Sequence, residues 1–200
     1  AAPLKETLAA ALLLKSGWPT VAAGAPLLDP FCGSGTFVIE AAWMAGDCAP
    51  GLLRDYWGFN GWLGHVPALW KRLLIEAEER REIGRTRIPP LFAGDCDPKA
   101  VRATLINAGR AGVADRVRVE RREWAAVEPP PGPPGLLIAN PPYGERLSDI
   151  DTVRFLHRCL GRKLRAQAGG WRACVLGASI EHLDEFRIAD FRQPRCFNGS

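Results

Sequence analysis

The stretch Asp29-Pro-Phe-Cys-Gly-Ser-Gly-Thr36 decides the fold, because it joins an apolar run to a helical pattern through a glycine-rich turn. Residues 26–31 are apolar enough for a short buried strand, and residues 36–45 carry the small and apolar side chains of a packed helix. Gly33 and Gly35 have no side chain, so a ligand can approach the backbone of the turn closely. The stretch therefore predicts a strand, a ligand-binding turn and a helix.

Strand and helix patterns alternate along the rest of the chain. Further strands are predicted at 91–94, 117–120, 136–139, 171–176 and 191–197. Helices are predicted at 4–16, 67–84, 98–111, 150–168 and 181–189. This alternation predicts an α/β fold, with a mainly parallel sheet and helices on both faces. Ligands of such folds lie at the carboxyl ends of the strands.

The composition is that of one folded domain. The chain has 200 residues, of which 47% are hydrophobic and 24% charged, and this excludes a disordered protein. An aromatic and helical segment over about 46–90 is interpreted as an insertion in the domain. No apolar run is long enough to span a membrane, so we expect no membrane partner. Six cysteines without a CxxC pair and three well-separated histidines predict reduced thiols in a cytoplasmic protein, with neither disulfides nor a metal site.

Three ligands compete for the glycine-rich turn: a dinucleotide, a nucleoside triphosphate and S-adenosylmethionine. The dinucleotide motif needs a third glycine where this chain has Val38, and the triphosphate loop needs a lysine that does not follow Gly35. The pattern that remains is an acidic residue at the end of the strand, Asp29, followed by Gly-x-Gly. It resembles the first motif of Rossmann-like, class I methyltransferases that use S-adenosylmethionine, where the turn holds the amino-acid part of the cofactor. The candidate contacts are Asp29, Pro30, Phe31, Cys32, Gly33, Ser34, Gly35 and Thr36.

Acidic residues also follow the second and third predicted strands. Asp95 directly ends the second strand, where its carboxylate can accept hydrogen bonds from both ribose hydroxyls. Asp97 precedes a proline and can instead cap the following helix, so Asp95, with Cys96 beside it, is the preferred cofactor contact. Glu123 is a candidate for the adenine amino group and Trp124 for packing on the adenine. A solvated charge and a core aromatic explain these last two residues equally well.

The sharpest motif is Asn140-Pro141-Pro142-Tyr143, at the end of a strand that is apolar throughout. The prolines fix the backbone and remove two amide donors, which leaves carbonyl groups for a ligand. The Asn140 side-chain oxygen and the Pro141 carbonyl can hold the two hydrogens of an exocyclic amine, while Tyr143 stacks on its base. Catalysis of methyl transfer to such an amine is mostly positioning. A base in a duplex must first leave the helix to enter the pocket.

Four separated blocks give the chain a resemblance to a known family, the THUMP-associated RNA guanine-N2 methyltransferases. The blocks are residues 2–10, 29–42, 49–52 and 140–147. They are most similar to the methylase domain of the bacterial large-subunit ribosomal RNA methyltransferase L, or fused K/L, type. The resemblance implies a class I methyltransferase fold that transfers a methyl group from S-adenosylmethionine to N2 of a guanine in 23S ribosomal RNA, with S-adenosylhomocysteine as product.

The resemblance also implies roles for single residues. The turn at 29–36 would line the methionine side of the cofactor, Asp95 the ribose and Glu123 the adenine, and residues 140–143 would hold the target amine. Glu6 and its neighbour Thr7 would pack near the methionine. The chain departs from the family, since the THUMP module and the hairpin partner of the last strand are missing and Glu123 replaces the usual aspartate. It is therefore interpreted as a monomeric catalytic-domain fragment with an incomplete sheet.

Other acceptors and roles remain open on the residues alone. The Asn140-Pro-Pro-Tyr143 motif also fits N6 of adenine in DNA or a glutamine amide in a protein, and only the flanking blocks favour RNA. A non-catalytic RNA-binding scaffold is disfavoured, because it need not keep both this motif and the glycine turn. The net charge of +4 is weak evidence for RNA. Basic clusters at 71–87 and 116–122 are ambiguous, Arg146 is the best single candidate for an RNA contact, and the aromatic residues of 56–62 are expected to form a small core.

Overall fold

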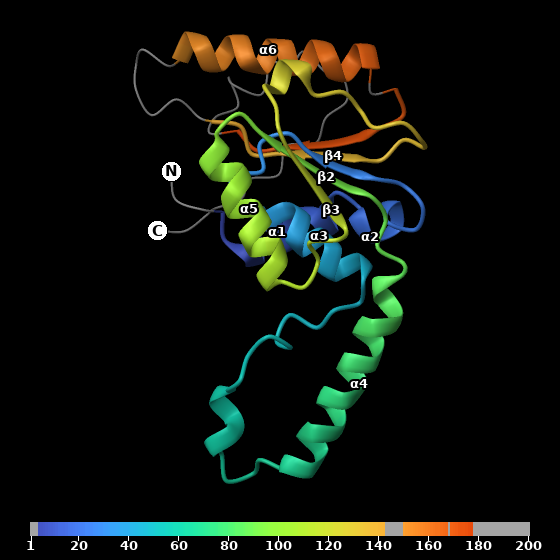
Figure 1. The fold of residues 1–200 in the computed structure, drawn as a ribbon, viewed down its shortest axis with the longest axis vertical. Helices are drawn as coiled ribbons and strands as arrows, with labels where there is room; N and C mark the ends of the chain where they lie inside the picture. The colour runs from blue at the N-terminus through green and yellow to red at the C-terminus, as the bar shows by residue number, and fades with distance from the viewer. Residues whose placement is uncertain (1–3, 143–149, 168, 178–200) are drawn as a thin grey trace.

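The computed structural model describes residues 4–142, 150–167 and 169–177. Its centre is a sheet of five strands in the order β3-β2-β1-β4-β5, in which every neighbouring pair is parallel (Figure 1). The strands are β1 (Leu27–Asp29), β2 (Leu91–Asp95), β3 (Val117–Arg121), β4 (Leu136–Ala139) and β5 (Arg172–Val175). The last predicted helix and strand, at 181–189 and 191–197, lie outside the described residues.

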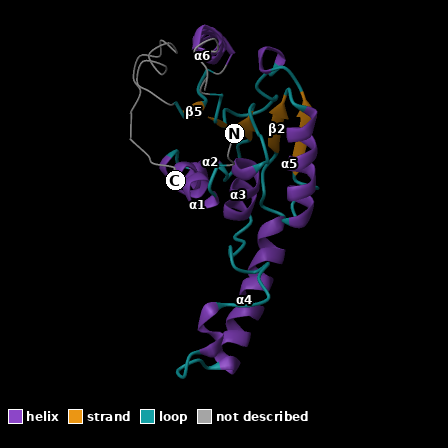
Figure 2. Cartoon of the chain, turned by 90° about the vertical axis from the view of Figure 1, so that its left-hand side faces the viewer, coloured by secondary structure: helices purple, strands orange, loops and turns teal. Residues whose placement is uncertain are grey.

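Helices cover both faces of the sheet, as Figures 1 and 2 show. Leu13, Val38 and Leu136 belong to the core on one face, and Leu137 and Leu160 to the core on the other. Alternate residues of β4 therefore enter opposite cores, as its continuous apolar sequence predicted. The first face carries α1 (Glu6–Lys15), α2 (Trp18–Val21), α3 (Thr36–Ala45) and α5 (Pro98–Arg110), and the second carries α6 (Ile150–Gln167) and the short 3-10 helix η2 (Trp124–Ala126).

The helix predicted at 4–16 is confirmed as α1 (Glu6–Lys15). A short second helix, α2 (Trp18–Val21), which was not predicted, follows it directly. Gly17 lies between them in the left-handed region, with φ of 77°, which a residue without a side chain adopts without strain. Pro19 then stands in the first turn of α2, where its missing N–H leaves no helix bond unmade.

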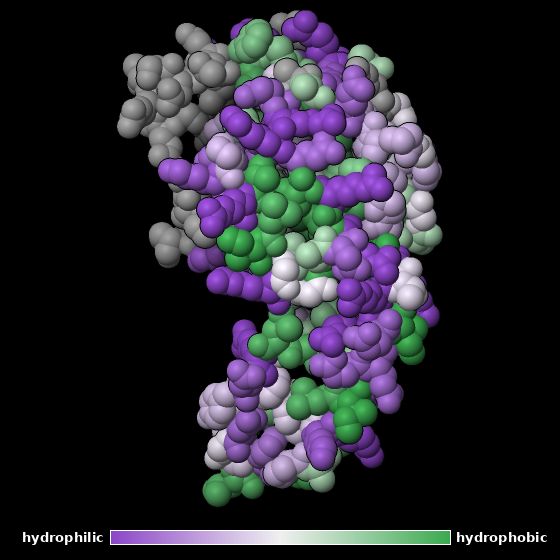
Figure 3. Space-filling view, in the orientation of Figure 1, coloured by the Kyte–Doolittle hydropathy of each residue, from purple (hydrophilic) through white to green (hydrophobic). Residues whose placement is uncertain are grey.

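Residues 46–90, here called the arm, project from the sheet and its helices (Figures 1 and 2). The arm contains the 3-10 helix η1 (Gly58–Gly61) and the 19-residue α4 (Pro67–Arg85). Trp57, Phe59 and Trp70 meet edge to face, with 4.8 Å between the ring centres of Phe59 and Trp70. The expected small aromatic core is therefore present. Other apolar side chains of the arm are exposed, among them Leu53, Trp62, Leu63, Val66, Leu69 and Leu73. Figure 3 shows hydrophobic patches, in green, on the surface of the arm.

Candidate cofactor and acceptor site

The carboxyl ends of β1, β2 and β4 lie side by side, because β1 pairs with both of the other strands. Leu27 pairs with Leu91 on one side and with Leu136 on the other. The same offsets, continued to the strand ends, bring Phe31 level with residues 95 and 140. The glycine turn, the acidic end of β2 and the acceptor motif are therefore neighbours at one edge of the sheet, as expected for ligand sites in a parallel sheet.

The two glycines of the turn serve different purposes. Both have positive φ, 54° at Gly33 and 87° at Gly35. A Cβ atom on Gly35 would lie 2.8 Å from Cγ2 of Thr104, so this position has no room for a side chain. A Cβ on Gly33 would meet no atom within 4 Å, so this position faces open space. Gly35 lets the turn pack on α5, and Gly33 leaves the outer side of the turn clear for a ligand.

Helix α5 braces the glycine turn from behind. The Thr104 hydroxyl donates to the Gly33 carbonyl at 3.0 Å, and the Asn107 side-chain amide donates to the Ser34 carbonyl at 2.9 Å. The Cys32 amide donates to the Gly94 carbonyl of β2 at 2.9 Å. Three partners from outside the turn thus fix its backbone. Thr104 and Asn107 were not predicted as site residues, because their i, i+3 spacing marks a polar pair on one helix face and does not tell which segment that pair contacts.

Asp95 and Asp97 have distinct partners. Oδ2 of Asp95 accepts from the Gly33 amide at 3.1 Å, and Oδ1 accepts from the Asp97 amide at 2.9 Å. Asp95 therefore lies against the glycine turn, at its exposed side. Oδ1 of Asp97 accepts from the Lys99 amide at 2.8 Å, so Asp97 caps α5, the role that its sequence position allowed. Asp95 stays the predicted ribose contact.

Asp29 ends β1 with a buried carboxyl group, only 1% exposed. Burial raises its pKa to about 8; the Phe31 amide, which donates to Oδ1 at 3.1 Å, acts against this rise, and the Asp95 charge adds to it. The carboxyl group is therefore mostly protonated at neutral pH while no cation lies beside it. Burial, followed by the Asp29 charge, also raises the pKa of the Cys32 thiol to about 12, so this thiol is neutral and packs as an apolar group.

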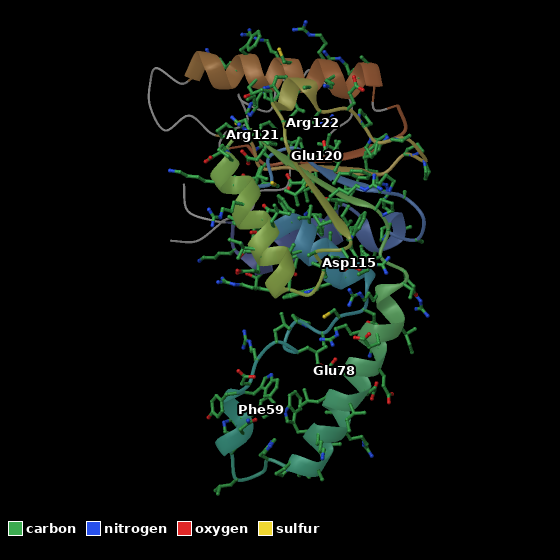
Figure 4. All side chains as sticks on the ribbon, viewed as in Figure 1. Phe59, Glu78, Asp115, Glu120, Arg121 and Arg122 are labelled. Carbon is green, nitrogen blue, oxygen red and sulfur yellow. The ribbon has the colours of Figure 1, made fainter. Side chains whose placement is uncertain are left out.

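The end of β3 adds Glu123 and Trp124 to the same edge. Figure 4 labels Arg121 and Arg122 at this end, and the Arg122 amide donates to the Asp95 carbonyl at 3.0 Å. Glu123 is exposed and lies close enough to Cys96 for its charge to raise the pKa of that thiol, after the effects of burial and of Asp95. Trp124 is half-buried and packs in the core beneath α6. Trp124 is thus a core aromatic residue, and its packing on adenine stays a prediction.

The acceptor motif follows the fully buried β4 directly. Asn140 is half-buried, Pro141 is fully buried and Pro142 is exposed. The chain therefore turns outward within three residues, at the edge that carries the glycine turn. Tyr143 and Arg146 lie outside the described residues.

The two remaining blocks of the family resemblance are the N-terminal block, which contains Glu6, and the block at 49–52. Glu6 begins α1 near α3, since its charge, after the larger effect of burial, raises the pKa of Glu40. Ala49 and Pro50 lie at the base of the arm, where they line a cavity of about 240 Å³ together with Arg80. This cavity contains none of the predicted cofactor or acceptor residues.

No helix among residues 4–142, 150–167 and 169–177 combines the length and the apolar character that crossing a membrane requires. Within the same ranges, no three His, Cys, Asp or Glu side chains are grouped as ligands of a metal ion would be.

Comparisons with known proteins identify the family of the chain. A family model described as "RMKL-like, methyltransferase domain" matches residues 1–200. The chain is 48% identical over 203 residues to the ribosomal RNA large subunit methyltransferase K/L of Syntrophotalea carbinolica, covering 100% of the chain and 28% of that relative. The chain thus spans about a quarter of the length of such relatives.

Similarity to solved structures identifies the fold. A candidate methyltransferase complexed with SAH, SMU.472, superposes with a TM-score of 0.86 at 33% identity, covering 100% of this chain and 51% of that one. A predicted N6-adenine-specific DNA methylase from Listeria monocytogenes has a TM-score of 0.70 at 31% identity, covering 93% of this chain and 47% of that one. The fold is therefore the Rossmann-like fold of these methyltransferases. Matched along its whole length, the chain belongs to the RMKL-like methyltransferase domain family.

Proposed function

We propose that the chain transfers a methyl group from S-adenosylmethionine to the exocyclic N2 amine of a guanine in 23S ribosomal RNA. The observation that carries the proposal is the row of strand ends, in which the register brings Asp95, the glycine turn and Asn140 to one level. The printed names of the relatives support ribosomal RNA as the substrate. The blocks that flank the acceptor motif favour guanine N2.

The cofactor's methionine end suits the Asp29 side of the row. The buried Asp29 carboxyl group becomes an anion readily only when a cation lies beside it, and the ammonium group of the cofactor is such a cation. Gly33 leaves open space on the outer side of the turn, where the methionine would lie. The donor set of this edge therefore fits S-adenosylmethionine, which would supply the methyl group.

The ribose and adenine suit the ends of β2 and β3. Asp95 already accepts two backbone N–H groups, and its position at the exposed side of the turn lets it accept the ribose hydroxyls as well. Glu123, exposed beside Cys96, would accept from the adenine amino group. Trp124 would contribute the apolar surface under the adenine.

The acceptor amine suits Asn140 and Pro141. The Asn140 side-chain oxygen and the Pro141 carbonyl would accept the two amine hydrogens and aim the nitrogen lone pair at the methyl carbon, with Tyr143 stacked on the guanine. The nitrogen–carbon bond forms as the sulfur–carbon bond breaks, and the bonding electrons stay on sulfur. The amine then loses one proton to water. No strong base is needed, so positioning accounts for most of the rate.

Parallel transfer assays test the proposal. The chain would be given labelled S-adenosylmethionine with 23S ribosomal RNA, with DNA and with a glutamine-bearing release factor, and digestion of the RNA would locate the label. We expect label on guanine N2 of the RNA alone. Label on DNA or protein would assign the acceptor to adenine or glutamine instead. Cofactor binding without transfer to any of the three would favour a non-catalytic RNA-binding scaffold.

A further inference from the structure

One peptide group of the glycine turn is held by a single hydrogen bond. The Gly35 amide donates to the Cys32 carbonyl at 2.7 Å, which makes residues 32–35 a tight turn. The φ angle is positive at Gly33, at 54°, and is not positive at Ser34. This combination is that of a type II′ turn, which differs from type I′ in the orientation of its central peptide group. In this chain the central group joins Gly33 to Ser34.

The peptide groups on either side of the central one are each held twice. The group ahead of it accepts from the Gly35 amide and donates to Asp95. The group after it accepts from Asn107 and donates to the Cys32 carbonyl. The central group accepts from the Thr104 hydroxyl at 3.0 Å, and its N–H group has no acceptor among the residues that the structure describes. The Thr104 bond therefore decides how the central peptide group is oriented.

Thr104 holds the central group from behind. Its side chain is fully buried on α5, and its hydrogen bond draws the Gly33 carbonyl toward that helix. In a trans peptide group, which this one is, the N–H bond points opposite to the C=O bond. The Ser34 N–H group is therefore aimed away from α5, toward the outer side of the turn that Gly33 leaves clear.

The two branches of the Thr104 side chain have separate roles. A Cβ atom on Gly35 would lie 2.8 Å from Cγ2 of Thr104, so this methyl group packs under the turn. The hydroxyl group makes the bond to Gly33, and Oγ1 also lies 3.4 Å from the Cys32 sulfur, which a methyl group can contact as well. Substitutions can therefore remove either role alone. Valine keeps the packing and loses the donor, whereas serine keeps the donor and loses the methyl group.

The methionine end of the proposed cofactor offers an acceptor for the Ser34 N–H group. At neutral pH that end carries an ammonium group, which only donates hydrogen bonds, and a carboxylate, which only accepts them. The ammonium group suits the Asp29 side of the turn. The carboxylate is then the partner that an outward-facing N–H group requires, and a hydrogen bond to a charged group is about twice as strong as a neutral one.

We propose that Thr104 is a positioning residue for the cofactor: its hydroxyl group holds the peptide group between Gly33 and Ser34 so that the Ser34 N–H group donates to the cofactor's carboxylate. The inference rests on the cofactor of the proposed function and not on its acceptor. Asn107 lies on the same face of α5 and is a weaker determinant, because the peptide group that it holds has a second bond within the turn. A loss at Asn107 is compensated by that bond, and a loss at Thr104 has no such compensation.

Calorimetric titration with S-adenosylhomocysteine tests the inference, because this product keeps the carboxylate and its binding needs no RNA. Thr104→Val should bind it about 10-fold more weakly, the effect of one lost hydrogen bond to a charged group. Thr104→Ser should bind within about 2-fold of the unchanged chain, and the matched control Asn107→Leu within about 3-fold. Full affinity in Thr104→Val, or an equal loss in Asn107→Leu or Thr104→Ser, would overturn the inference. Thermal unfolding shows that each variant is folded at the temperature of the titration.

The Ser34 amide resonance supplies a signature that a merely structural role of Thr104 would not give. In the proton–nitrogen correlation spectrum of the unchanged chain, the Ser34 amide proton should move downfield when S-adenosylhomocysteine binds, since a carboxylate acceptor deshields it. The movement should persist in Thr104→Ser and be lost in Thr104→Val at saturating ligand. An unmoved Ser34 amide in the unchanged chain would overturn the inference whether or not any variant folds.

The same measurements separate this inference from the proposed function. Failure of the unchanged chain to bind S-adenosylhomocysteine would overturn the cofactor assignment and the inference together. Cofactor binding with the expected variant series, but with no methyl transfer to guanine, would overturn the proposed acceptor and support the role of Thr104. Methyl transfer to guanine with full affinity in Thr104→Val would overturn the role of Thr104 and support the proposed function.

Discussion

The carboxyl edge of the sheet and the arm are held by different kinds of contact. At the edge, the backbone of Gly33 is hydrogen-bonded both to Asp95 of β2 and to Thr104 of α5, which lie 62 and 71 residues further along the chain. In the arm, Arg80 and Asp47 pair at the surface with both side chains half exposed, and the aromatic rings pack on one another. In Figure 4, Phe59 lies in the arm at the lower end of the molecule and Arg121 lies near the upper end, at the edge of the sheet. The edge depends on the whole fold and the arm on local contacts, so substitutions should matter in that order.

The largest effect is expected at Asn140. Replacing Asn140 with alanine removes the side-chain oxygen that would hold one amine hydrogen, so methyl transfer to RNA should fall by about 100-fold or more. Affinity for S-adenosylmethionine should change little, because the turn and Asp95 stay intact. Transfer of label to 23S ribosomal RNA measures the first effect and calorimetric titration the second. Equal transfer by variant and unchanged chain would refute the positioning role.

The next effect separates the two aspartates after β2. Asp95→Ala removes the carboxylate that would bind the ribose, and the loss of charge-assisted hydrogen bonds should weaken cofactor binding about 10- to 100-fold. Asp97→Ala is the matched control. It removes the α5 cap, which should lower stability by about 1 kcal/mol while cofactor affinity stays the same. The opposite pattern in calorimetry would move the ribose role to Asp97.

The two glycines of the turn allow a sharper comparison within the edge. In Gly35→Ala the new methyl group would meet Thr104 in a backbone region that alanine disfavours, and stability should fall by about 2–4 kcal/mol. Gly33→Ala meets open space and carries only the backbone strain, so its stability should fall by about 1 kcal/mol. The new methyl group at position 33 would nevertheless occupy the space proposed for the methionine part of the cofactor. Thermal unfolding with and without S-adenosylmethionine measures both effects, and equal stability losses would contradict the division of roles.

The pH dependence of cofactor binding should report Asp29. Its pKa of about 8 means that the free protein holds a proton there at neutral pH, and a cationic ligand would release it. Cofactor affinity should therefore rise about 50-fold from pH 6 to pH 8, because the ionised fraction of Asp29 rises from about 1% to about 50%, and it should level off above about pH 9. The unliganded protein should behave oppositely, since neutral Asp29 favours folding and this contribution is lost as pH rises through 8. Asp29→Asn should flatten both profiles, and an unchanged binding profile would remove Asp29 from the ammonium site.

The sequence alone predicts most of the strands and helices that form the carboxyl edge of the sheet. Strands were predicted at 91–94 and 136–139, because apolar runs bounded by turn residues have few alternatives, and the structure has them as β2 and β4. The proline after Asp97 offered that residue as a helix cap, which it is. Contacts between segments that are far apart in the sequence could not be predicted from the hydrophobic pattern. Thr104 braces the turn only because β2 and α5 bring it behind Gly33, which no spacing in the sequence reports.

The neutrality of the basic segment at 71–87 was not predicted for a related reason. The acids that pair with Arg80 and Arg85 are Asp47 and Asp115, which lie about 30 residues away from them in the chain. The segment therefore looks more basic in the sequence than it is in the fold.

The smallest effect is expected in the arm. Arg80 donates two hydrogen bonds to Asp47, at 2.8 and 2.9 Å, and this contact lowers the pKa of the Asp47 carboxyl group. Both side chains are exposed to solvent that screens the pair, so Arg80→Ala should lower stability by at most about 1 kcal/mol. Methyl transfer and cofactor affinity should not change. Thermal unfolding in low and high salt checks this, since the loss should shrink as salt screens the pair. A loss as large as that of Gly35→Ala would mean that the arm and the edge share one cooperative unit, and the contrast between them would fail.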